Sequence, residues 1–143
     1  MHSLPLQEGD QELVDAATDI IRKRFERGRH HVAAAVRGES GAVYTGVNIE
    51  ATAGRAAVCA EAVAIGRGLT VGEKGFLTIV GMMHPLEASD DSPQVWGGAP
   101  CGLCRELLAD YMPDGFVLMP LGGQMHRVSV VDLLPLKYTA ELT

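Results

Sequence analysis

Hydrophobic positions follow a helical spacing near the start of the chain and a strand-like pattern after it. From Asp10 to Phe25, apolar side chains recur at helical intervals between charged residues, which predicts an amphipathic helix. Two short apolar runs, at 31–36 and 42–47, flank a glycine-rich turn and predict a β-hairpin. The N-terminal part of the chain is therefore expected to contain a helix followed by two paired strands.

The rest of the chain alternates between helical and strand-like patterns. The alanine-rich segment from Val58 to Leu69 predicts a buried helix. The continuous apolar run Phe76–Met83 predicts a strand buried on both faces, and a long polar loop is expected over 84–99. The remaining expected elements are a helix at 101–112, strands at 116–119 and 126–128, and a short helix or turn at 130–134.

The order of these elements predicts a three-layer α/β/α sandwich around a five-stranded mixed sheet. The chain is 143 residues long, which suits one domain over residues 1–143. Neither an internal repeat nor a low-complexity segment interrupts the sequence.

Composition narrows the class of protein further. Hydrophobic residues make up 47% of the chain and charged residues 21%, which excludes a disordered or fibrous protein. No apolar run approaches the ~20 residues that span a bilayer, and the N-terminus lacks the pattern of a secretory signal. We therefore expect a soluble, cytoplasmic protein without a membrane partner.

The charge balance disfavours one class of ligand. Lys and Arg number 12 against 18 Asp and Glu, so the net charge is −6. A net negative protein repels a phosphate backbone, and no basic-aromatic stripe offsets this repulsion. Nucleic-acid binding is therefore not expected, whereas a neutral nucleoside meets no such barrier.

The main chemical signal is the spacing of the three cysteines, Cys59, Cys101 and Cys104. Cys101 and Cys104 lie one turn apart at the start of an expected helix, which suits two ligands of one metal or a redox pair. Cys59 opens another helix, where the partial positive charge favours a thiolate. Three converging thiolates would fill three positions of a tetrahedral zinc site and leave the fourth open for water, as in catalytic sites.

Glu61, two residues after Cys59, separates the catalytic interpretation from its alternatives. A carboxylate there can take a proton from a metal-bound water and pass it to a leaving group. A dithiol redox protein or a structural zinc site completed by His84 or His126 stays open, but neither needs this carboxylate. Cys-x-Glu followed by Pro-Cys-x-x-Cys is the pattern of zinc nucleobase deaminases.

Four blocks of sequence extend this pattern. They are Tyr-Thr-Gly-Val-Asn-Ile-Glu at 44–50, Cys-Ala-Glu at 59–61, Pro-Cys-Gly-Leu-Cys-Arg at 100–105 and Val-Asp-Leu-Leu-Pro at 131–135. Together they resemble the cytidine deaminase family, in its small three-cysteine form, to which blasticidin S deaminases are related. The resemblance runs from Arg29 to the C-terminus and implies a cytidine deaminase-like fold.

The resemblance implies a zinc-dependent nucleoside deaminase. Cys59, Cys101 and Cys104 would bind Zn²⁺, and Glu61 would shuttle protons during hydrolysis of cytidine or deoxycytidine to uridine or deoxyuridine, with release of ammonia. The backbone of Ala60 would lie beside the amino group of the base. The alternative substrate is a modified cytosine nucleoside of the blasticidin S type.

The resemblance also implies how the nucleoside is held. Asn48 and Glu50 would bind a ribose hydroxyl, since an amide and a carboxylate together offer a donor and an acceptor. His30 stands at the family's aromatic position against the base or sugar, and Tyr138 is expected to stack on a base in a neighbouring subunit. Family members are usually homotetramers acting in pyrimidine salvage.

Two departures from the family concern the substrate and the charge at the metal. Ala62 replaces an arginine that would relieve the negative charge of three thiolates, and Arg105 is the nearest remaining cation in the sequence. Gly54 replaces an aromatic residue. Together with the loop at 84–99, this glycine is expected to admit a bulkier nucleoside.

Overall fold

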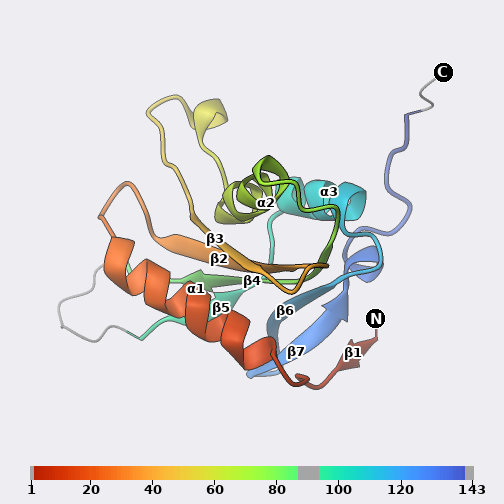
Figure 1. Ribbon diagram of the computed structural model, residues 1–143. Coiled ribbons are helices and arrows are strands. Elements are labelled where there is room, and N and C mark those ends of the chain that lie inside the picture. The colour runs from red at the N-terminus through yellow and green to blue at the C-terminus, as the bar shows by residue number, and fades with distance from the viewer. Residues whose placement is uncertain (1, 87–93, 141–143) are drawn as a thin grey trace.

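A mixed β-sheet forms the middle layer of the molecule, with α1 on one face and α2 and α3 on the other (Figure 1). The computed structural model describes residues 2–86 and 94–140. Its helices are α1 (Asp10–Arg24), α2 (Ala60–Thr70), α3 (Gly102–Tyr111), and the short 3₁₀ helices η1 (Gly54–Ala56) and η2 (Val130–Leu133). Its strands are β1 (Ser3–Leu4), β2 (Val32–Gly38), β3 (Val43–Val47), β4 (Phe76–Met83), β5 (Trp96–Gly98), β6 (Phe116–Leu121) and β7 (Gln124–Ser129).

The three-layer α/β/α architecture predicted from the sequence is confirmed, but the sheet has seven strands instead of five. Its order is β1-β7-β6-β4-β2-β3, and β5 pairs with β4 beside this path. The pair β4–β6 is parallel and the others are antiparallel. The prediction missed β1 and β5 because strands of two and three residues are too short to show an alternating pattern.

Two hydrophobic cores lie on opposite faces of the sheet. Ala35 and Val80 pack against Leu13 and Ala17 of α1, whereas the neighbouring Ala34 faces the cluster formed with α2 and α3. Successive side chains of a strand point to opposite faces, so the continuous apolar sequences of β2 and β4 supply both cores. The central strands are therefore buried between α1 on one face and α2 and α3, at whose N-termini the cysteines lie, on the other.

A glycine brings β3 and α2 into close contact. A Cβ atom at Gly46 would lie 2.6 Å from the backbone nitrogen of Ala64, so no larger residue fits without movement of the backbone. The close approach places the end of β3, and the Asn48–Glu50 segment after it, beside the start of α2. Packing therefore holds the sequence block 44–50 next to the block at 59–61.

A buried ion pair anchors the start of α1 to β7. Arg127 Nη1 donates to Asp10 Oδ1 at 2.7 Å, and the guanidinium lies 4.4 Å over the ring of Phe116. The second carboxylate oxygen of Asp10 accepts the backbone N–H of Gln7 at 2.7 Å.

Within the described residues, none of the helices is long and apolar enough to cross a membrane.

Candidate active site

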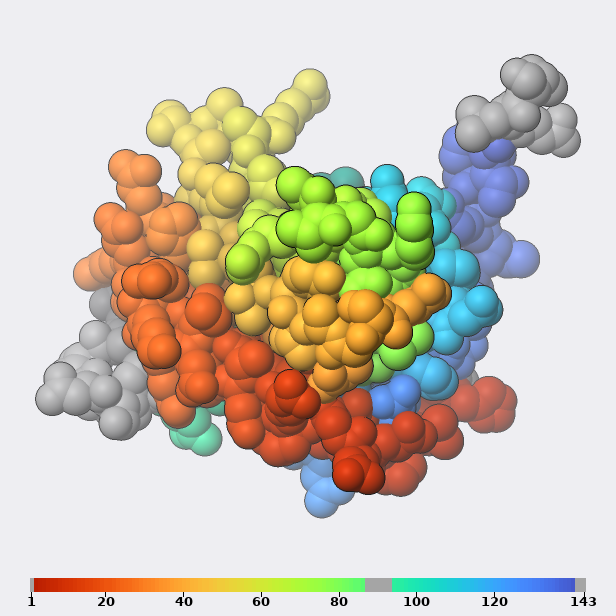
Figure 2. All heavy atoms as spheres, in the orientation of Figure 1, coloured from red at the N-terminus to blue at the C-terminus, as the bar shows by residue number. Residues whose placement is uncertain are grey.

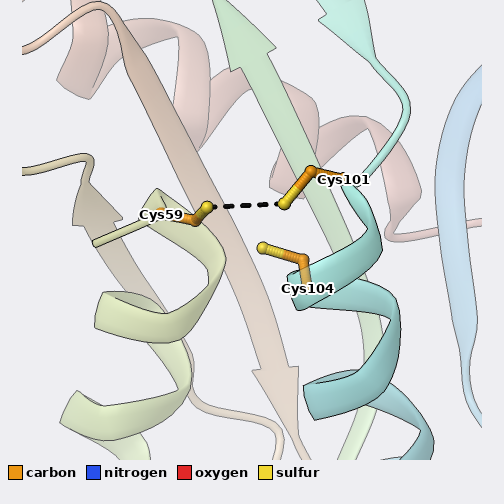
Figure 3. Close-up of side chains that lie close together, drawn as sticks. All are labelled: Cys59, Cys101 and Cys104. Carbon is orange, nitrogen blue, oxygen red and sulfur yellow. Dashed lines mark hydrogen bonds between the residues drawn. The ribbon is translucent and has the colours of Figure 1, made fainter. Parts of the chain in front are cut away.

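The three cysteines converge at the N-termini of α2 and α3. Cys59 is the N-cap residue of α2, Cys101 is the N-cap residue of α3, and Cys104 lies in the first turn of α3. Their side chains point toward one another across the space between the two helices (Figure 3). Both helix dipoles therefore direct their positive ends at the sulfur atoms, which stabilises negative charge there.

The geometry of the cysteine cluster fits a zinc ion. The three Sγ atoms lie within 4.8 Å of one another, and Cys59 Sγ is 3.5 Å from Cys101 Sγ. Sulfur ligands about 2.3 Å from a tetrahedral zinc lie about 3.8 Å apart. Small side-chain adjustments would bring these atoms to that spacing. An all-sulfur donor set is also one that zinc binds readily.

The protonation behaviour of the cluster also favours a bound cation. Burial raises the pKa of Cys104, and the charge of Glu61 raises it further. Burial likewise raises the pKa of Cys59. Burial opposes ionisation of Cys101 as well, but hydrogen bonds from the Cys104 backbone and the Cys59 thiol lower its pKa overall. Because the site resists further negative charge, a divalent cation is what would hold all three sulfurs as thiolates.

Two histidines considered as a fourth ligand lie elsewhere. His84 is buried and stacks on Phe25 with ring centroids 3.7 Å apart, and His126 lies on β7. Among the described residues, the one group positioned to hold a metal consists of the three cysteines. The fourth position is thus left without a protein ligand from the described chain, which is the arrangement of a catalytic zinc site.

Arg105 holds the backbone around the cluster. Its Nε donates to the carbonyl oxygen of Pro100 at 2.9 Å, and its Nη1 donates to that of Leu133 at 3.2 Å. These bonds connect the start of α3 to η2. We infer that Arg105 positions the Cys-x-x-Cys segment, and that the N-termini of α2 and α3 add positive potential at the sulfur atoms.

Glu61 lies at the cysteine cluster with little solvent exposure. Its side chain is on the first turn of α2 and is 8% exposed, and the Cys104 thiol donates to its Oε2 across 3.5 Å. A Cβ atom at Gly81, on β4, would lie 3.1 Å from Glu61 Oε1. The missing side chain at Gly81 therefore leaves the space that the carboxylate occupies.

A pocket of about 310 Å³ opens at the cluster. It is lined by His31, Val32, Asn48, Glu50, Gly54, Ala57, Val58, Cys59, Ala60, Glu61, Gly81, Met83, Gly98, Ala99, Cys101 and Leu103. Its volume is at the lower end of the range for small-molecule sites. The charged lining residues are Glu50 and Glu61, and none of the described lining residues is Lys or Arg. The pocket therefore suits a neutral or cationic ligand better than a phosphorylated one.

Most of the residues expected to hold the nucleoside meet in this pocket. Asn48, Glu50 and Ala60 line it, and so do Gly54, Cys59 and Cys101. Asn48 is 6% exposed and Ala60 is 1% exposed, so both belong to the wall of the pocket.

The structure brings His31 to the pocket in place of His30. His30 Nδ1 donates to the backbone carbonyl of Asn48 at 2.7 Å, and His30 is not among the lining residues. Neighbouring residues in an extended segment face opposite sides, so only one of the two histidines can face the pocket. Sequence reasoning did not identify His31, nor Gly81, because the strand register that places them was not known from spacing alone.

Tyr138 is not among the residues that line the described pocket. Tyr138 is 80% exposed, and the tail that contains it projects from the molecule on a different side from the η1 segment (Figure 1, Figure 2). Its expected contact with a neighbouring subunit stays a prediction. Residues 87–93 of the loop lie outside the described residues.

Comparison with known proteins identifies the family. Residues 7–119 match the sequence model of the family described as the cytidine and deoxycytidylate deaminase zinc-binding region. The chain is 43% identical over 139 residues to blasticidin-S deaminase of Bacillus cereus, covering 97% of this chain and 99% of that protein. It is 30% identical over 112 residues to cytidine deaminase of Sporosarcina psychrophila, covering 77% and 76%.

A solved structure agrees with this assignment. Cytidine deaminase from Burkholderia pseudomallei aligns with a TM-score of 0.69 and 26% identity, covering 90% of this chain and 98% of that one. Because the family match spans most of the chain and includes Cys59, Glu61, Cys101 and Cys104, this chain belongs to the cytidine deaminase family of zinc-dependent hydrolytic deaminases.

Proposed function

We propose that this enzyme deaminates cytosine nucleosides, converting them to uracil nucleosides with release of ammonia. The observation that carries the proposal is the placement of the Glu61 carboxylate beside three converging cysteines at a pocket of nucleoside-compatible size. Neither a structural zinc site nor a dithiol switch needs a carboxylate in this position. The lack of Lys and Arg among the described lining residues favours nucleosides over nucleotides.

The proposed reaction divides the work between the cation and Glu61. Cys59, Cys101 and Cys104 would hold the zinc ion, which would supply Lewis acidity to a water molecule in the pocket. Glu61 accepts a proton from that water and delivers it to N3 of the cytosine ring while the water oxygen adds at C4. Glu61 then carries the second proton to the exocyclic amine, the C4–N4 bond breaks and ammonia leaves. The net change is one water consumed and one ammonia released.

Two substrates are favoured by different observations. The 43% identity over nearly the whole chain favours a modified nucleoside of the blasticidin S type. The polar Asn48–Glu50 segment in the pocket favours a hydroxylated sugar, as in cytidine or deoxycytidine. Both substrates present the same cytosine ring to Glu61, so the proposed chemistry is common to them.

The surroundings of the enzyme follow from the family resemblance. We propose a cytoplasmic homotetramer that acts in pyrimidine salvage when cytidine is the substrate. Tyr138 would reach the pocket of a neighbouring subunit, consistent with its 80% exposure in the single chain.

A substrate panel tests the proposal. Purified protein is assayed for ammonia release from blasticidin S, cytidine, 2′-deoxycytidine, free cytosine and cytidine monophosphate. We expect deamination of at least one of the three nucleosides, and at least tenfold lower kcat/KM for free cytosine and for the monophosphate. Zinc-loaded protein that releases ammonia from none of the nucleosides would contradict the proposed function.

A further inference from the structure

The orientation of the Asn48 side-chain amide is fixed by the backbone around it. Its Oδ1 accepts the backbone N–H groups of His31 at 2.8 Å and Val32 at 2.9 Å. Backbone N–H groups only donate, so the atom that receives them is the carbonyl oxygen of the amide and not its nitrogen. Both lone pairs of this oxygen are used inside the protein.

This orientation determines the tautomer of His31. The Nδ2 of Asn48 donates to Glu50 Oε1 at 3.1 Å and lies 3.3 Å from His31 Nδ1. Because an amide nitrogen can only donate, His31 Nδ1 must accept. The neutral imidazole therefore carries its proton on Nε2.

Asn48 has no hydrogen-bonding capacity left for a ligand after these contacts. His31 and Glu50, in contrast, keep one polar atom each, since Nε2 of His31 and Oε2 of Glu50 have no hydrogen-bond partner among the described residues. Both side chains line the pocket, and they are 27% and 42% exposed. They are also neighbours, with His31 Nδ1 4.0 Å from Glu50 Oε1.

The family resemblance already assigns Glu50 to a ribose hydroxyl. We propose that His31 lies beside Glu50 as the donor to that same hydroxyl, and that Asn48 positions both side chains. The Nε2–H of His31 donates to the hydroxyl oxygen, and Oε2 of Glu50 accepts the hydroxyl proton. This inference rests on the proposed function, and it makes His31 a specificity-determining residue. A ligand that lacks the hydroxyl leaves a donor and an acceptor unpaired in the pocket, which a site of this kind discriminates against.

Variants at position 31 separate the donor from the shape of the ring. His31→Phe keeps an aromatic ring but removes both nitrogens. His31→Gln keeps a donor at a reach similar to that of Nε2, and His31→Asn retains a polar group too short to reach as far. Zinc content and thermal unfolding are measured for each, so that a folding defect is recognised. His31→Asn replaces His31→Phe in the comparison if the phenylalanine variant does not fold.

The experiment measures kcat/KM for cytidine, 2′-deoxycytidine and 3′-deoxycytidine, and calorimetric binding of uridine and its two deoxy analogues. For the native protein we expect kcat/KM for cytidine to be at least tenfold higher than for one of the two deoxy substrates. Uridine should likewise bind more tightly than the deoxyuridine that lacks the same hydroxyl. His31→Phe and Glu50→Ala should each abolish that preference, mainly because kcat/KM for cytidine falls. His31→Gln should keep most of it.

Two failures are distinguishable. A native preference that persists in His31→Phe, or a native protein with no preference among the three nucleosides, would overturn the role of His31 and leave the proposed function in place. A native protein that deaminates blasticidin S but neither binds uridine nor deaminates cytidine would also overturn the role of His31 and leave the proposed function in place. Ammonia release from no cytosine nucleoside would overturn both.

Discussion

A glycine determines how much space the Glu61 carboxylate has. Gly81 lies under the carboxylate, and a Cβ atom there would be 3.1 Å from Oε1, a distance at which the oxygen must shift by a few tenths of an ångström. Proton transfer depends on the position of that oxygen relative to the base and the water. We infer that the glycine at position 81 preserves the geometry of Glu61.

Gly81→Ala is therefore expected to lower kcat by about tenfold or more, because small displacements of a catalytic group reduce its effectiveness. Zinc content and the urea midpoint should remain near their native values. Gly66→Ala is the matched control, since a Cβ at Gly66 has no heavy atom within 4 Å and the residue lies outside the pocket. Equal kcat values for the two variants would argue against this role of Gly81.

Residues whose chemistry depends on local spacing were predictable from the sequence, and those that depend on register were not. Cys101 and Cys104 are brought together by one turn of helix, so their joint position follows from the sequence. The choice between His30 and His31 depends on how the chain enters β2, where a shift by one residue exchanges the two faces. The bonds of Asn48 to His31 and Val32 specify that register, and they link positions 16 or more residues apart.

Among the elements, α1 is attached to the sheet by a buried charge pair in addition to its hydrophobic core. The side chains of Asp10 and Arg127 are 5% and 10% exposed, and they join residues at the start of α1 and on β7. Removal of one member leaves the other charge buried without its partner, which is costly. The pair Glu12–Arg37 offers a contrast, because Glu12 is 64% exposed.

Asp10→Ala is accordingly expected to lower the free energy of unfolding by about 3–5 kcal/mol, the usual cost of breaking a buried ion pair. Glu12→Ala should cost about 1 kcal/mol or less, as for exposed pairs. Urea denaturation of both variants measures the difference. If Asp10→Ala were no more destabilising than Glu12→Ala, the pair would have no special part in holding α1.

The long elements could be predicted from the sequence, and the short ones could not. β4 has the predicted bounds, because a run of eight residues that holds no charged side chain and six large apolar ones, flanked by glycine and histidine, indicates a buried strand. β1 and β5 form through pairing with strands that are distant in sequence or follow a loop, and nothing in their own two or three residues indicates it. Their omission changed the number of strands but not the layers.

For the whole molecule, the fold brings four separate segments of the chain to one site. The ends of β3 and β4 and the N-termini of α2 and α3 meet at the pocket, so residues as distant as Asn48 and Cys101 share one cavity. The net charge of −6 and the two carboxylates in the pocket act in the same direction, against phosphorylated ligands. Fold, charge and metal chemistry therefore support the same class of substrate.

The most direct test of this account measures zinc content and ammonia release side by side for the native protein and Glu61→Gln. The amide is nearly isosteric with the carboxylate but cannot carry a proton. We expect about one zinc per chain in both proteins, and a loss of about 10²–10⁴-fold or more in deamination by the variant. A Glu61→Gln protein within tenfold of native activity, or a native protein that is folded and active without metal, would contradict the central claim.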